Sequence, residues 1–276
     1  MSLPQGPIGV FDSGFGGLTV LRELRAALPQ ADFLYLGDNA RAPYGTRSFE
    51  LVYEFTLQAV RRLFDSGCPL VILACNTASA KALRSIQQRD LPVLAPERRV
   101  LGVIRPTVEA LAARTRTDCV GVFGTPGTVA SHSYRMELAK LAPGIRVFEH
   151  ACPMWVPLVE NREGDGDGAD YFIRKDIEAL MAECQDIDAV VLGCTHYPLL
   201  IEKIRRYMPA GVDIILQGPM VAASLVDYLR RHPDIDAAIT RGATTRYLTT
   251  EQPSRFDSLA TLFMGEEVRS EKIELK

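Results

Sequence analysis

One pattern occurs twice in this chain: an apolar run, a small residue, a cysteine and two residues with hydrogen-bonding side chains. The copies are residues 70–77, LVILACNT, and residues 189–196, AVVLGCTH. Continuous apolar runs rich in Val, Ile and Leu are typical of strands buried in parallel sheets. Ligands of such sheets bind beyond the carboxyl ends of the strands. The pattern therefore predicts two thiols, Cys75 and Cys194, at strand ends that face one crevice.

Other predicted strands also end in loops rich in glycine and hydroxyl side chains. Residues 7–11 lead into 12–17, DSGFGG; residues 32–37 lead into 38–45, DNARAPYG; and the strand from Cys119 ends in the loop at 124–128, GTPGT. A strand-to-helix turn exposes backbone N–H groups that can bind an anion. We expect a carboxylate ligand there.

The first of these loops does not favour a dinucleotide. The fingerprint G-x-G-x-x-G is incomplete, because Thr19 stands where the third glycine is required. Asp12 precedes this loop, either as a helix cap or as a group that handles protons.

Strands and amphipathic helices alternate along the chain, which predicts a doubly wound α/β fold with parallel sheets. Proline- and arginine-rich residues 90–106 and residues 208–213 are interpreted as linkers. We expect a first domain of residues 1–98 plus 213–276, with a strand from 212 returning to it, and a second domain of residues 99–212.

Composition excludes several classes of protein. The 276 residues carry a net charge of −3, so no nucleic-acid partner is expected. No apolar run is long enough for a membrane helix, and the N-terminus does not resemble a secretory signal. Six cysteines without a C-x-x-C pair favour a reducing cytoplasm. Only Cys194-x-His196 approaches zinc-ligand spacing, so we expect no metal.

Two similar thiols favour one type of chemistry. A cysteine hydrolase uses a single nucleophile with a base, and it has no role for a second thiol. Inverting a carbon centre needs two groups, because a proton leaves one face and another arrives at the opposite face.

Five blocks of residues resemble one family. Residues 9–20, 37–45, 74–80, 125–128 and 193–200 are similar, in order and position, to those of glutamate racemases in the aspartate/glutamate racemase superfamily. The resemblance implies two similar α/β domains facing each other across the active site, no cofactor, and L- and D-glutamate as substrates. It also implies a cytoplasmic, homodimeric enzyme that supplies D-glutamate for peptidoglycan.

The resemblance also implies roles for individual residues. Cys75 would deprotonate D-glutamate with help from Asp12, and Cys194 would deprotonate L-glutamate with help from His196. The residues implied to bind substrate are Asp12, Ser13, Tyr44, Gly45, Asn76, Thr77, Thr125, Thr128, Thr195 and His196.

Two positions stay open at this stage. Glu160 falls in a further family block without an assigned role, and Gln217 stands where the family commonly has aspartate. The alternatives are a racemase of another acidic amino acid, such as aspartate, and a non-catalytic module that binds amino acids.

Overall fold

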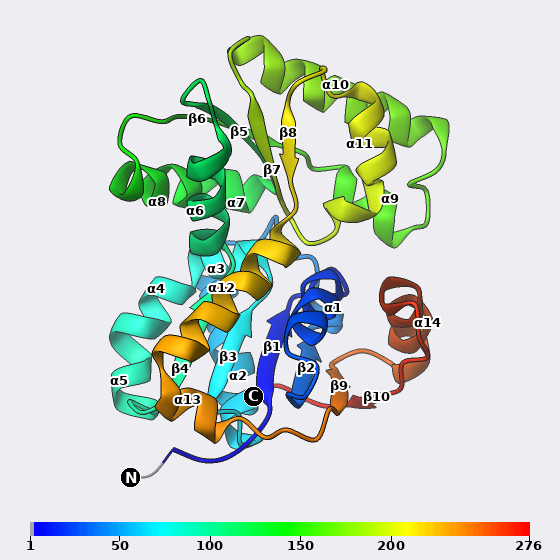
Figure 1. The fold of residues 1–276 in the computed structure, drawn as a ribbon. Helices are drawn as coiled ribbons and strands as arrows, with labels where there is room; N and C mark the ends of the chain where they lie inside the picture. Colours follow the sequence, from blue (N-terminus) through cyan, green and yellow to red (C-terminus); the bar gives the residue numbers. More distant parts are fainter. Residues whose placement is uncertain (1–2) are drawn as a thin grey trace.

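The computed structural model describes residues 3–276, which form two parallel sheets covered by helices (Figure 1). The first sheet has the strand order β10-β9-β2-β1-β3-β4 and the second has the order β6-β5-β7-β8. The strands of the first sheet are β1 (Ile8–Asp12), β2 (Phe33–Gly37), β3 (Leu70–Leu73), β4 (Arg99–Gly102), β9 (Thr245–Thr249) and β10 (Ser270–Lys272). Those of the second are β5 (Cys119–Gly124), β6 (Arg146–Ala151), β7 (Ala189–Gly193) and β8 (Asp213–Ile215).

Helices connect the strands in the alternation that the sequence predicts. The longer α-helices are α1 (Leu18–Ala27), α2 (Phe49–Asp65), α6 (Ile104–Arg114), α8 (Ser133–Leu141), α10 (Asp167–Glu183), α11 (Ile201–Tyr207), α12 (Gln217–Arg231) and α14 (Pro253–Met264). The shorter ones are α3 (Asn76–Lys81), α4 (Leu83–Ser85), α5 (Leu91–Leu94), α7 (Pro126–Ala130), α9 (Trp155–Glu160) and α13 (Pro233–Ala238). Within residues 3–276, no helix combines the length and the hydropathy needed to span a bilayer.

Both faces of each sheet are buried. Along β1, Ile8 and Val10 pack into one apolar cluster and Phe11 into another on the opposite face. Along β7, Val190 and Val191 divide in the same way between two clusters of the second domain. Because neighbouring strand residues point to opposite faces, this division confirms the predicted doubly wound α/β fold.

Two short strands lie in different sheets from those we expected. β4, assigned by sequence to the second domain, pairs with β3 in the first sheet, and β8, expected to return to the first domain, pairs with β7 in the second. The apolar side chains decide the first case, because Val100 and Leu101 pack against clusters on either face of the first sheet. The N-terminal segment of the first sheet thus runs to Gly102, beyond the expected boundary at 98, and the second sheet runs to Ile215, beyond the expected boundary at 212.

Candidate active site

A cavity of about 120 Å³ lies where the carboxyl ends of strands from both sheets meet. That volume is room for several water molecules or one small ligand. Its walls are formed by Ser13, Ala42, Pro43, Tyr44, Gly45, Thr46, Cys75, Asn76, Thr77, Thr125, Pro126, Cys152, Pro153, Val156, Pro157, Glu160, Cys194, Thr195 and His196. Both cysteines of the repeated pattern therefore reach one cavity, as expected.

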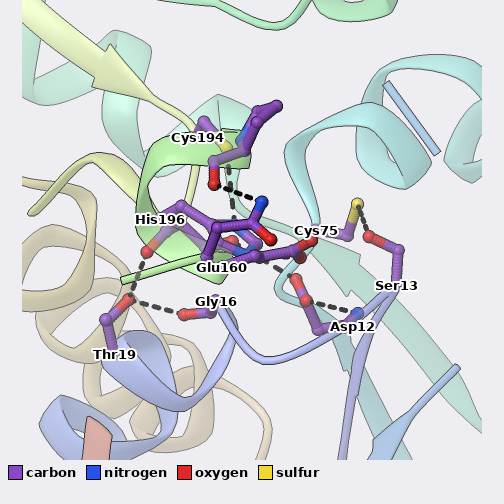
Figure 2. A network of polar contacts seen from close by, with 12 residues as sticks. Asp12, Ser13, Gly16, Thr19, Cys75, Glu160, Cys194 and His196 are labelled. Carbon is purple, nitrogen blue, oxygen red and sulfur yellow. Dashed lines mark hydrogen bonds and ion pairs between the residues drawn. The ribbon is translucent and has the colours of Figure 1, made fainter. Parts of the chain in front are cut away.

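Cys75 lies at the N-terminus of α3, directly after β3. Its sulfur accepts a hydrogen bond from the Ala78 backbone N–H at 3.4 Å. Its thiol also lies 3.4 Å from the Ser13 hydroxyl, as Figure 2 shows. Burial raises the pKa of Cys75 to about 12, and the negative charge of Asp12 contributes in the same direction. Cys75 is therefore a thiol at neutral pH.

Cys194 has a different set of neighbours. Its Sγ lies 3.8 Å from Nδ1 of His196, whose Nε2 lies 3.1 Å from Oε1 of Glu160. Burial lowers the pKa of His196, but hydrogen bonds and opposite charges from Cys194 and Glu160 outweigh it and raise the pKa to about 10. His196 thus keeps its proton at neutral pH and places a positive charge beside the sulfur.

Asp12, at the end of β1, lies behind the cavity wall. Its Oδ2 accepts from the Gly14 backbone N–H at 2.8 Å, and the Thr195 hydroxyl of the second domain contacts Oδ1 at 3.4 Å. Burial raises the pKa of Asp12, although the positive charge of His196 opposes this. In residues 3–276 no hydrogen bond joins Asp12 to Cys75, so its influence on that sulfur is electrostatic.

The turn after Asp12 packs tightly against the second domain. A Cβ atom on Gly16 would lie 2.2 Å from Oγ1 of Thr195 and 2.5 Å from Nδ1 of His196. The Thr19 hydroxyl also donates to the Thr195 backbone carbonyl at 3.1 Å (Figure 2). The close approach of the two domains here requires glycine at position 16.

Three threonine hydroxyls from the two domains meet beside Cys75. Oγ1 of Thr77 lies 3.0 Å from that of Thr125 and 3.4 Å from that of Thr128, and the last two are 3.0 Å apart. Thr128 stands behind this group and outside the cavity wall. Thr77 and Thr125 form a polar wall whose hydroxyls can donate hydrogen bonds to a carboxylate, with Thr128 behind them.

The Asn76 side chain turns away from this wall into a buried amide network. Its Oδ1 accepts from the Tyr134 hydroxyl at 2.7 Å and from Nε2 of Gln217 at 3.1 Å. Gln217 also contacts the hydroxyls of Tyr134 and Thr107 at 2.8 and 3.0 Å. The neutral Gln217 side chain, which stands where the family commonly has aspartate, therefore forms its own hydrogen bonds with Asn76, Tyr134 and Thr107.

The structure brings most of the predicted residues together. Of the implied site residues, only Asp12 and Thr128 lie outside the wall, each in contact with residues that form it. Tyr44 is part of the wall, while its hydroxyl donates to Asp38. Sequence reasoning missed the apolar side of the cavity, Cys152, Pro153, Val156 and Pro157, and the contact of Glu160 with His196.

The wall has no lysine or arginine among the described residues. Lys81 of α3 is not part of the wall and donates to the Arg47 backbone carbonyl at 2.7 Å. A ligand with negative charges would therefore be held by hydroxyls, backbone N–H groups and His196.

Comparison with known proteins places the chain among racemases. The profile of the Asp/Glu/Hydantoin racemase family matches residues 13–226. A glutamate racemase of Dinoroseobacter shibae is 43% identical over 97% of this chain and 98% of its own. Among solved structures, a glutamate racemase isoform of Bacillus anthracis is 34% identical, with a TM-score of 0.89 and 98% of both chains covered. The glutamate racemase of Francisella tularensis, solved with D-glutamate, is 31% identical with a TM-score of 0.87, over 99% of this chain and 98% of its own.

Proposed function

Since this chain belongs to the Asp/Glu/Hydantoin racemase family, we propose that it interconverts L- and D-glutamate, with Cys75 and Cys194 as the two acid–base groups. The observation that carries the assignment of the two bases is the placement of both thiols in one cavity, each on a strand end of a different sheet. Two bases that reach a stereocentre from separate domains can act on its two faces.

In the direction from L- to D-glutamate, the Cys194 sulfur takes the α-proton and becomes a thiol. The electron pair left on the α-carbon then takes the proton of the Cys75 thiol from the other face, which leaves Cys75 as a thiolate. The reverse reaction exchanges these roles. One proton is removed and one is added in each turnover.

The unequal surroundings of the two sulfurs favour one resting form. The pKa of Cys75 is raised to about 12, so this residue starts with its proton, whereas the protonated His196 places a positive charge beside the Cys194 sulfur. In this form the enzyme is ready to accept L-glutamate. Release of D-glutamate leaves the opposite form, which returns through the reverse reaction or by exchange with solvent.

Removing the α-proton is the difficult step, because this proton is far less acidic than a thiol with an ordinary pKa of about 8.5. Hydrogen-bond donors fixed around the developing negative charge stabilise it most where water is excluded. Thr77, Thr125 and the first backbone N–H groups of α3 can donate hydrogen bonds to the carboxylate next to the reacting carbon. Closure of the domains over the ligand would remove water from the cavity.

The enzyme is proposed to work in the cytoplasm as a homodimer and to supply D-glutamate for peptidoglycan. Homodimers are the commonest oligomers of soluble proteins. A bacterial strain that requires added D-glutamate should grow without it when it expresses this chain, and a C75A/C194A variant should fail to support that growth.

Circular dichroism of substrate solutions tests the reaction itself. Solutions of L-glutamate and of D-glutamate should each lose their optical activity and reach the same mixture of the two enantiomers. A solution of L-aspartate should keep its optical activity. Faster loss with L-aspartate would assign the enzyme to the other acidic amino acid. Binding of glutamate without any change in optical activity would favour a non-catalytic module.

A further inference from the structure

Three side chains of types that can bind a metal lie together at one wall of the cavity: Cys152, which is part of the wall, and His150 and Asp176 behind it. His150 is near the end of β6, Cys152 follows that strand, and Asp176 projects from α10. One ligand atom from each lies within 4.8 Å of the other two. Nε2 of His150 is 3.3 Å from Oδ1 of Asp176.

We propose that His150, Cys152 and Asp176 form a binding site for a zinc-type divalent cation. Imidazole nitrogen, thiolate sulfur and carboxylate oxygen are the ligands that zinc takes in proteins, and three of them leave a fourth position open to water. Cys152 would lose its thiol proton to solvent when the metal binds. Cys152 and Asp176 are buried, while the His150 side chain is 22% exposed and provides the entry path.

Charges around the three residues favour a cation. Within residues 3–276, no lysine or arginine forms a hydrogen bond or ion pair with any of the three side chains. A second cluster, Cys119, Cys184 and Asp186, differs in this respect. There Arg146 Nη2 lies 2.7 Å from Cys119 Sγ and 3.5 Å from Oδ2 of Asp186. The positive guanidinium group of Arg146 thus already pairs with two of the three side chains.

Neighbouring groups hold the proposed ligands in place. The Phe123 ring packs edge-on against His150, with 6.5 Å between ring centroids, and stacks on Trp155 at 5.2 Å. The Tyr197 hydroxyl donates to the Cys152 backbone carbonyl at 3.2 Å. Such contacts orient ligands before the metal binds. Trp155 is the one tryptophan of the chain and reports on this region.

Cobalt(II) is the probe, because it takes zinc sites and its absorption reveals thiolate ligands in tetrahedral geometry. Metal-free protein titrated with cobalt chloride should develop a thiolate-to-cobalt charge-transfer band and visible bands that saturate at one cobalt per chain. Zinc should then abolish them, because zinc binds more tightly than cobalt. The charge-transfer band should be lost in C152S and retained in C184S, which removes a thiol of the other cluster.

The H150Q variant provides a second test that keeps every cysteine. It should lose the tetrahedral bands, with Trp155 fluorescence confirming that the variant is folded. The absence of bands in the unmodified protein, or their survival in C152S or H150Q, would overturn the proposal. The inference does not depend on racemisation, which is assayed separately on the metal-free protein.

Discussion

At the scale of single residues, the two sulfurs that we propose as bases share one chemistry but differ in their partners. Cys75 faces the Ser13 hydroxyl, and Cys194 faces the charged pair of His196 and Glu160. The proposed reaction needs one sulfur that carries a proton and another that can accept one. The different partners of the two sulfurs suit these two roles.

Replacing either sulfur should stop the reaction. C75A and C194A should each lower kcat by about 10²- to 10⁴-fold, the usual contribution of a positioned acid or base. C184S is the control, since Cys184 lies outside the cavity, and it should keep ordinary activity. Substantial racemisation by either alanine variant would refute the assignment of two bases.

The E160Q variant tests the partner of His196. It keeps the shape of the side chain but loses the charge that helps raise the pKa of His196. A hydrogen bond to a charged group contributes about 1.5–3 kcal/mol, so kcat should fall by roughly 10- to 100-fold. The alkaline limb of the pH–rate profile should move to lower pH in E160Q and stay near its original position in E160D. An unchanged profile in E160Q would show that Glu160 does not act through His196.

The same histidine should make stability depend on pH. Folded His196 has a pKa of about 10, against an ordinary value of 6.5, so between these values the folded state holds a proton that the unfolded state has released. Its contribution is fully present below 6.5 and is lost as the pH rises through about 10, with a slope of up to about 1.4 kcal/mol per pH unit. Between pH 6.5 and about 10, the free energy of unfolding, measured with denaturant, should therefore change less with pH in H196Q than in the unmodified protein. Parallel curves for the two proteins would contradict the raised pKa.

Some of these residues could be predicted from sequence and others could not. Cys75 and Cys194 follow long apolar runs, and the carboxyl end of a buried parallel strand is where a ligand site is expected. Glu160 has no such local pattern. Its position depends on α9, which is held by Trp155 packed between Phe123 and Tyr197, and those three aromatic residues come from distant segments.

At the scale of elements, the turn between β1 and α1 sets the distance between the domains at the site. G16A should lower kcat/KM strongly, because its methyl group would collide with Thr195 and His196, and overpacking of this kind costs about 1–3 kcal/mol of stability. G144A is the matched control, since a methyl group there meets no atom within 4 Å. Equal activity of the two variants, measured by circular dichroism, would show that the close approach has no functional role.

Element type was easier to predict than strand pairing. β4 and β8 have only four and three residues. Strands this short carry too little sequence pattern to indicate which sheet they join, so each was expected in the other sheet. β9 lies between β2 and β10 rather than at an edge of the sheet. β10 was missed because its three residues, Ser270–Lys272, are polar, as suits the outermost strand.

At the scale of the whole molecule, each domain supplies one sulfur, and the cavity exists only where the domains meet. The hydroxyls of Thr77 and Thr125 and the contact between Thr195 and Asp12 join the two domains around it. This arrangement could be predicted because the same strand-end pattern occurs twice. The site at His150, Cys152 and Asp176 could not, since it depends on how α10 packs against β6.

Racemisation in heavy water tests the central claim, two bases on opposite faces, most directly. L-glutamate should yield D-glutamate that carries deuterium at the α-carbon from the first turnover, while unreacted L-glutamate keeps its proton, as measured by NMR and mass spectrometry early in the reaction. D-glutamate that retains the original α-proton would show that one base serves both faces, and the proposed mechanism would be wrong.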